Sequence, residues 1–284
     1  MQKLTILHVS DFHFTDTELN YSQLRQSNEL FTKKSIGLFN LKLKRARHFK
    51  LSQQAKILTK LLTLTWDYLI ITGDLTSLAS ETEFCLAKEK LSPLIKKGPV
   101  IIIPGNHDYY TPKALVQDFF KLHFSENNPG INKNDSGQLP LIQLNDHIIV
   151  FSVNMVQPAP FYSSRGYLSN EVLTQYQDLF KTEYKGHIKI AIGHYPVFLP
   201  KGITEGYLHS FTGKKQLRSF LLENDIHLYL HGHIHKSWSF SPEVKNPLIS
   251  INSGGACRYA NGEWAGFHQI EINDQKIEIN RRLV

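Results

Sequence analysis

The chain contains five short runs that are apolar almost throughout, and longer amphipathic stretches separate several of them. These runs cover residues 4–10, 68–72, 100–103, 188–192 and 226–230. A run this short that stays apolar along its length is typical of a strand covered on both faces. Because buried strands alternate with helix patterns here, the sequence predicts an α/β fold, with a more antiparallel C-terminal third.

Helix start signals lie between the strands. Ser80 with Glu83 three residues later forms a capping box, which predicts a helix that runs toward Lys97. Thr111 followed by Pro112 predicts the start of another helix. Further helices are predicted over residues 52–64, 169–184 and 212–223. A hairpin is expected at 139–144 and 147–153, and late antiparallel strands at 247–252, 266–272 and 276–282.

Length and composition predict a single globular domain over residues 1–284. With 41% hydrophobic residues, the chain has enough apolar mass for one large core, and no Pro-, Gly- and Ser-rich linker divides it. Two cysteines cannot form a disulfide framework, so Cys85 and Cys257 are expected to be reduced and packed. No run of about 18 apolar residues occurs, and the N-terminus does not resemble a signal peptide. We therefore expect a cytoplasmic protein.

The net charge of +7 has a local origin. Residues 25–50 hold eight basic residues and one acidic residue, and the rest of the chain is neutral. A nucleic-acid binder would carry basic residues along a whole surface, so nucleic acid is not the expected partner. This segment belongs to a basic and apolar insert at about 14–50. One interpretation is a lid for an amphiphilic substrate, or a peripheral contact with an anionic inner membrane surface. The alternative is a solvated basic flap.

Each of the five apolar runs is followed by residues of the types that bind metal ions. The blocks are Asp11-Phe12-His13, Gly73-Asp74, Gly105-Asn106-His107-Asp108, Gly193-His194 and Gly232-His233-Ile234-His235. Sites in open α/β sheets gather at the carboxyl ends of strands, and glycine there permits a sharp turn and close backbone approach. Imidazole nitrogen beside carboxylate oxygen favours Mn, Fe, Zn or Co over Mg or Ca. The sequence therefore predicts a metal site at the strand ends.

In order and spacing, these five blocks resemble the calcineurin-like metallophosphoesterases. The resemblance implies a four-layer αββα sandwich, in which helices flank two mixed β-sheets, and a binuclear site for two divalent metal ions, with manganese expected in vitro. The first metal would be held by Asp11, His13 and His235. The second would be held by Asn106, His194 and His233. Asp74 would bridge the two metals, His107 would face the substrate, and Asp108 would orient His107.

The resemblance also implies a metal-dependent phosphohydrolase. In such an enzyme a metal-bridging hydroxide attacks phosphorus, and His107 donates a proton to the leaving oxygen or stabilises it. We favour a phosphodiester or pyrophosphate bond over a phosphomonoester. Cyclic-nucleotide phosphodiesterases and UDP-diacylglucosamine pyrophosphatases of lipid A synthesis are similar in these blocks, and both substrate classes stay open. A non-catalytic scaffold is disfavoured because no ligand is missing, and no obligate protein partner is inferred.

Several residues outside the blocks have competing interpretations. His8 and His227 lie inside strands and are expected to be packed, whereas His231 could support a metal ligand from behind. Arg165 could contact a substrate phosphate or be solvated, and Tyr195 could line the pocket or only pack. The remaining histidines are expected at the surface or in loops: His48, His123, His147, His187, His209 and His268.

Overall fold

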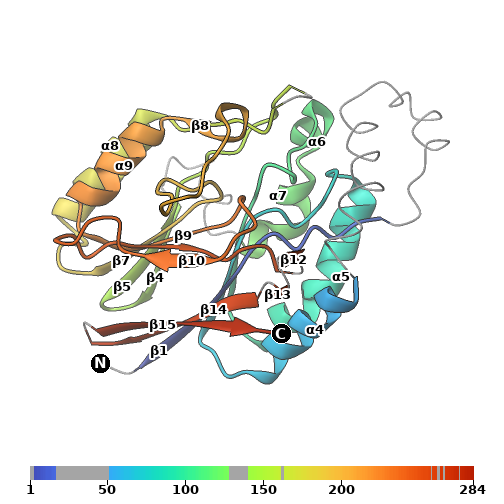
Figure 1. The fold of residues 1–284 in the computed structure, drawn as a ribbon, viewed down its shortest axis with the longest axis horizontal. Helices are drawn as coiled ribbons and strands as arrows, with labels where there is room; N and C mark the ends of the chain where they lie inside the picture. Colours follow the sequence, from blue (N-terminus) through green and yellow to red (C-terminus); the bar gives the residue numbers. More distant parts are fainter. Residues whose placement is uncertain are drawn as a thin grey trace.

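The computed structural model describes residues 3–16, 51–127, 140–160, 163–256, 258–260, 263–264, 266–274 and 276–284. Beyond residue 16, the insert predicted at 14–50 lies outside the described residues, and so does its basic segment at 25–50. The lid and membrane-contact interpretations therefore stay predictions. Within the described part, two large sheets form the centre of the molecule (Figure 1).

The first sheet has the strand order β15-β14-β1-β2-β3. Its parallel strands are β1 (Leu4–Val9), β2 (Tyr68–Thr72) and β3 (Val100–Ile103). The antiparallel strands are β14 (Gly266–Asn273), which pairs with β1, and β15 (Lys276–Leu283). Strands from both ends of the chain thus share one sheet, which is consistent with a single domain. The single-domain assignment itself stays a prediction.

The second sheet has the order β10-β11-β9-β7-β5-β4. Its parallel strands are β5 (Ile148–Ser152), β7 (Ile188–Ile192), β9 (Ile226–His231) and β11 (Ile249–Asn252). The antiparallel edge strands are β4 (Leu141–Asn145) and β10 (Trp238–Phe240). The hairpin of β4 and β5 is confirmed. The strand predicted at 247–252 was expected to be antiparallel, but β11 runs parallel to β9, so for that pairing the prediction is wrong. β11 is antiparallel only to β10, a strand that the sequence did not indicate.

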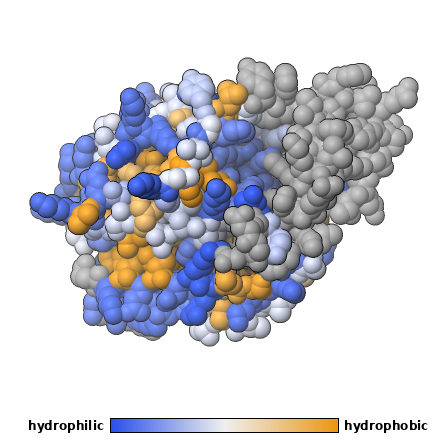
Figure 2. All heavy atoms as spheres, viewed as in Figure 1, coloured by the Kyte–Doolittle hydropathy of each residue, from blue (hydrophilic) through white to orange (hydrophobic). Residues whose placement is uncertain are grey.

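The sheets pack face to face through an aliphatic layer, in which Ile6 and Ile70 of the first sheet and Ile190 and Leu228 of the second share one cluster. Successive strand residues point to opposite faces, so alternate residues of the same strands face the helices. Helices α4 (Leu51–Thr63) and α5 (Glu81–Lys97) cover the first sheet, and α8 (Asn170–Lys181) and α9 (Lys214–Glu223) cover the second. The predicted αββα sandwich is confirmed. On the face shown in Figure 2, hydrophobic patches interrupt a largely hydrophilic surface.

Local signals placed most helix starts correctly. The Ser80 hydroxyl accepts a hydrogen bond from the Glu83 N–H at 3.2 Å, and the Glu83 carboxylate accepts from the Ser80 N–H at 3.3 Å, so the capping box is present. The helix predicted after Thr111 is instead two short helices, α6 (Pro112–Gln117) and α7 (Phe119–Phe124). They meet at Asp118, whose left-handed backbone ends α6 and whose carboxylate caps α7.

The remaining described elements are short. They are η2 (Ser125–Asn127), β6 (Gly166–Tyr167), η4 (Tyr207–His209), β8 (Phe211–Thr212), β12 (Tyr259–Ala260) and β13 (Glu263–Trp264). No described helix is both long enough and apolar enough to cross a membrane.

Three side-chain predictions need comment. Cys85 is exposed on α5 rather than packed. His268 was expected at the surface but is buried in β14, because its side of the strand faces His8 of β1, with 6.3 Å between the ring centroids. His8 is packed in the sheet as predicted.

Candidate metal centre

The ligand-bearing segments follow five parallel strands that end at one edge of the sandwich. Backbone hydrogen bonds join the segments after β1 and β2, from the Asp11 N–H to the Gly73 carbonyl and from the His13 N–H to the Asp74 carbonyl, both at 3.0 Å. A bond from the His233 N–H to the Asp11 carboxylate, at 3.2 Å, joins the two sheets. Residues far apart in sequence therefore meet at this edge.

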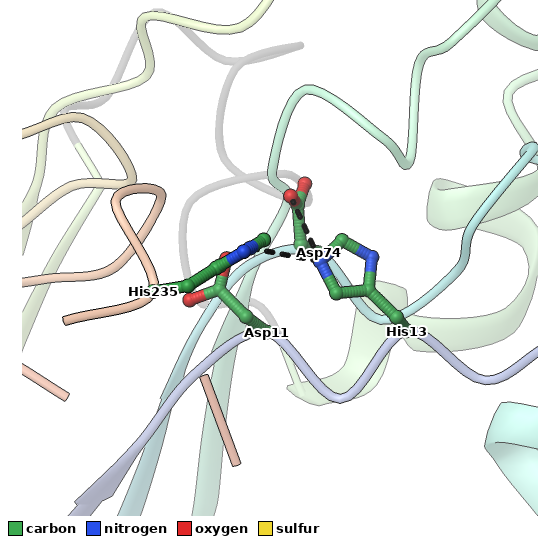
Figure 3. Close-up of side chains that lie close together, drawn as sticks. All are labelled: Asp11, His13, Asp74 and His235. Atoms are coloured by element: carbon green, nitrogen blue, oxygen red, sulfur yellow. Dashed lines mark hydrogen bonds and ion pairs between the residues drawn. The ribbon is translucent and has the colours of Figure 1, made fainter. Parts of the chain in front are cut away.

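One group of potential ligands consists of Asp11, His13, Asp74 and His235 (Figure 3), whose ligand atoms all lie within 4.8 Å of one another. The Nε2 atoms of His13 and His235 face each other at 3.1 Å. The His235 Nε2 lies 3.2 Å from the Asp11 Oδ1, and the His13 Nε2 lies 3.7 Å from the Asp74 Oδ2. All but His235 are buried.

A second group surrounds the amide of Asn106. Its Oδ1 lies 3.1 Å from the His194 Nε2 and 2.9 Å from the His233 Nδ1. Asp74 reaches this group through its other oxygen, since Oδ1 is 3.4 Å from the His194 Nε2. The two carboxylate oxygens of Asp74 therefore face one group each. The seven residues predicted as metal ligands all come together, in the two sets predicted.

Backbone carbonyls orient three of the imidazoles. The His13 Nδ1 lies 3.2 Å from the Thr76 carbonyl and the His194 Nδ1 lies 2.8 Å from the Thr72 carbonyl. For His233 the pattern is reversed, with Nε2 at 2.7 Å from the carbonyl of His209. A carbonyl only accepts, so the nitrogen beside it carries the hydrogen and the opposite nitrogen offers a lone pair to the group. Lone pairs and oxygens that converge in this way suit divalent cations.

The backbone at the centre is strained. Five of the seven candidate ligands have positive φ angles although they are not glycine: Asp11 at 56°, His13 at 50°, Asp74 at 54°, His233 at 73° and His235 at 55°. Such conformations cost of order 1–3 kcal/mol each and cluster at functional sites. Close approach also matters, because a Cβ at Gly105 would overlap the Asp74 carboxylate. Glycine is therefore needed at this position to bring the β3 loop against Asp74.

Electrostatics at the centre favour a cation. Burial alone would raise the pKa of Asp11, but the facing imidazoles of His235 and His194 lower it to about 2. Burial would lower the pKa of His194, yet the Asp74 carboxylate raises it to about 9. Burial lowers the pKa of His233 to about 3, so this imidazole stays neutral and keeps its lone pair. Asp74 therefore attracts positive charge to the position that the second metal would take.

His107 and Asp108 lie beside the two ligand groups, and their predicted roles stay predictions. The His107 Nδ1 lies 2.7 Å from the Ser77 carbonyl, and the His107 ring stacks on Tyr110. The backbone N–H of His107 donates to the Asp74 Oδ1 at 2.8 Å. The Asp108 carboxylate accepts hydrogen bonds from the N–H groups of Leu75, Thr76 and Gly105 and from the Thr76 hydroxyl. Asp108 thus connects the β2 and β3 loops, and the Ser77 carbonyl is the direct ring partner of His107.

Other buried residues pack against the segments that carry the candidate ligands. Tyr195, for which two interpretations were open, is buried, and its ring centroid lies 4.6 Å from that of His233. His231 contacts Ser250 and Asn252, and the Asn252 amide donates to the Gly232 carbonyl at 2.5 Å.

The carbonyls of Thr72, Thr76, Ser77 and His209 gave no signal in the sequence, because every residue has a carbonyl.

The αββα sandwich and the two converging groups of candidate ligands together define the class of binuclear metallohydrolases. Residues 4–237, most of the chain, match the family model of the calcineurin-like phosphoesterases, so the chain belongs to that family. It is accordingly a metal-dependent hydrolase that acts on phosphate esters.

Solved structures agree on the fold. A dimetal phosphatase from Danio rerio is 12% identical with a TM-score of 0.63, and the match covers 99% of this chain and 96% of that one. A purple acid phosphatase from yellow lupin (Lupinus luteus) seeds is 11% identical with a TM-score of 0.64. The match covers 100% of this chain and 53% of the lupin chain, so this chain spans about half of it. No curated protein matches the sequence.

Proposed function

We propose that this enzyme hydrolyses phosphodiester or pyrophosphate bonds with two divalent metal ions, drawn from Mn, Fe, Zn and Co. One ion would be held by Asp11, His13 and His235, the other by Asn106, His194 and His233, and Asp74 would be shared. The observation that carries the proposal is the position of Asp74, whose two oxygens face the two ligand groups at 3.7 and 3.4 Å.

Charge supports a diester or pyrophosphate over a monoester. Two divalent ions held by the carboxylates of Asp11 and Asp74 leave an excess of two positive charges. A water that has lost its proton offsets one of them, so a single negative charge on the substrate neutralises the site. A phosphodiester carries one charge per phosphoryl group, whereas a monoester carries about two at neutral pH.

His107 is proposed to assist the leaving oxygen. Bound metal ions would lower the pKa of water and offset negative charge on phosphoryl oxygens. The bond between the His107 Nδ1 and the Ser77 carbonyl assigns one hydrogen to Nδ1, so the proton for the leaving oxygen would come from Nε2 of the doubly protonated ring, which returns to the neutral form. The ring is held for this task by stacking on Tyr110, with 5.0 Å between the ring centroids.

Metal removal and replacement, followed by a substrate panel, test the proposal. Chelated protein should be inactive, and manganese should restore turnover with about two bound ions per chain by elemental analysis. The panel comprises p-nitrophenyl phosphate, bis(p-nitrophenyl) phosphate, cyclic AMP and UDP-glucose. We expect a higher kcat/KM for the diesters or the pyrophosphate than for the monoester. Preference for the monoester would refute the bond type, and activity without metal would refute the mechanism.

A further inference from the structure

Two surface segments are joined beside the second ligand group. The N–H of Ser164 donates to the Leu208 carbonyl at 3.0 Å, and the N–H of Gly166 donates to the Ser210 carbonyl at 3.2 Å. The Ser164 hydroxyl contacts the His209 Nδ1 at 2.9 Å. β6 then pairs in parallel with β8. Arg165 lies between Ser164 and Gly166, so its backbone is fixed on both sides.

The same two segments contact the ligand His233. The His209 carbonyl pairs with the His233 Nε2 at 2.7 Å. On the other segment, the Ser164 carbonyl accepts a hydrogen bond of 2.5 Å from the hydroxyl of Tyr195, whose ring packs on His233. Gly166 packs tightly here, since a Cβ would overlap the Met155 carbonyl. Arg165 thus directly follows Ser164, whose carbonyl holds the tyrosine that packs on His233.

The side chain of Arg165 is held in place but has no acidic partner among the residues that the structure describes. Its guanidinium carbon lies 4.0 Å from the ring centroid of Tyr207, which is largely exposed on η4. Its Nε is buried and has no hydrogen-bond partner in the described part of the chain. The carboxylate of Glu205, which lies 3.9 Å from the His233 Nε2, is already paired with Lys214, with 2.7 Å between their charged atoms. A guanidinium fixed on an aromatic face and not neutralised is suited to binding phosphate or carboxylate.

We propose that Arg165, supported by Tyr207, binds a second anionic group of the substrate, a phosphoryl or carboxylate group beyond the phosphoryl held at the metal centre. The proposal rests on the proposed function, because it assumes that the first phosphoryl binds at the two ligand groups. It explains why the positive charge is placed on a segment fixed to His233 rather than on a free surface loop.

Calorimetric titration of manganese-loaded protein with three non-hydrolysed probes tests this assignment. Inorganic phosphate has one anionic group, imidodiphosphate adds a second phosphoryl group, and phosphonoacetate adds a carboxylate. Replacing Arg165 by Gln should weaken imidodiphosphate or phosphonoacetate binding about tenfold or more, and phosphate binding less than about twofold. The probe that loses more affinity identifies the second group. Arg165→Lys should recover part of the loss, since charge is kept without the planar fork.

Arg218→Gln is the matched control. Arg218 also stacks on a ring, that of Phe198 at 5.4 Å, and the change removes the same charge from an exposed site on α9. We expect all three affinities to stay at the wild-type values. Equal affinities for wild type and Arg165→Gln would overturn the proposal. So would an equal loss for phosphate, or a loss of bound manganese, which would show a structural role.

Turnover of bis(p-nitrophenyl) phosphate, measured on the same preparations, separates the two proposals. A wild-type protein that binds imidodiphosphate through Arg165 but hydrolyses no ester refutes the proposed function alone. If the wild-type protein hydrolyses esters, but Arg165→Gln leaves the affinities for imidodiphosphate and phosphonoacetate unchanged, only the proposed role of Arg165 is refuted.

Discussion

Replacing Asp108 by Asn tests whether this residue connects the ligand loops or orients His107. Asp108 is fully buried, and its Oδ2 accepts from the N–H groups of Leu75 at 3.2 Å and Gly105 at 2.8 Å. Its Oδ1 accepts from the N–H and the hydroxyl of Thr76, both at 2.9 Å. Whichever oxygen becomes an NH₂ group, at least one buried backbone N–H loses its acceptor.

The expected cost follows from these contacts. One unsatisfied buried donor costs about 1–3 kcal/mol, and the remaining hydrogen bonds lose the strengthening that a charged acceptor gives. From the hydrogen bonds alone, we therefore expect Asp108→Asn to lower the free energy of unfolding by about 2–5 kcal/mol. A shift of about 2–4 °C per kcal/mol in a chain of this size converts that loss into a Tm lower by roughly 4–20 °C.

Thermal unfolding of metal-depleted protein at pH 8.5 measures this effect without a contribution from metal binding. Burial and the charge of Asp74 raise the pKa of Asp108 to about 7, so the wild-type carboxylate is ionised at that pH and the wild-type fold bears the cost of a buried charge that asparagine does not carry. This cost offsets part of the loss that the hydrogen bonds predict. Asp146→Asn, in the exposed turn between β4 and β5, is the control and should stay within about 0.5 kcal/mol of wild type. A variant with unchanged Tm that loses rate only on substrates with poor leaving groups would refute the connecting role.

Three further predictions concern the centre and its surroundings. Asp74→Ala removes the shared ligand, so elemental analysis should show loss of both metals and turnover should fall by several orders of magnitude; full occupancy would contradict this. His107→Asn should keep the metals but lose about 10²–10⁴ in rate with alkoxide leaving groups and less with p-nitrophenolate, whereas equal losses would argue against proton donation. Burial lowers the pKa of His268 to about 4, so stability is full above the unfolded pKa of about 6.5 and falls as the pH drops toward 4. His268→Gln should remove about 2–3 kcal/mol of that loss in urea unfolding between pH 7 and 4.5, and an unchanged pH profile would contradict the assignment.

The parts of the fold predicted well from the sequence are those that depend on residue type and periodicity. The strands β1, β2, β3, β7 and β9 are apolar on both faces, and the helices at α4, α5, α8 and α9 begin near their predicted starts. All seven candidate ligands are residues whose side chains bind metals, and the fold brings them together. Their roles as ligands stay predictions that metal analysis can test.

What the sequence did not predict depends on backbone geometry or on tertiary pairing. The carbonyls that orient His13, His194 and His233 belong to residues of no particular type. Two-residue strands such as β6 and β8 are too short to show a period, yet they hold Arg165 in place. The break at Asp118 depends on one left-handed residue within an otherwise helical pattern, and aspartate tolerates that conformation.

The positive φ angles of five candidate ligands raise the question of whether the chain gives up stability to place these side chains. His235 has a φ of 55°, and its alanine and glycine variants both lose the imidazole and differ only at Cβ, so comparing them isolates the backbone effect. A residue with a Cβ costs about 1–2 kcal/mol in this region, whereas glycine costs little there but loses about 0.5–1 kcal/mol more chain entropy on folding.

We therefore expect metal-depleted His235→Gly to be more stable than His235→Ala by about 0.5–1 kcal/mol, measured by urea unfolding. The control pair Asp178→Gly and Asp178→Ala, at an exposed position in α8, should show the opposite order, because alanine is favoured by about 1 kcal/mol in a helix. If alanine is more stable than glycine at both sites, the left-handed conformation at His235 is not strained. If glycine is the more stable variant at His235 and alanine at Asp178, the backbone at His235 is strained. The chain then gives up stability for a backbone conformation that directs the imidazole toward Asp11 and His13.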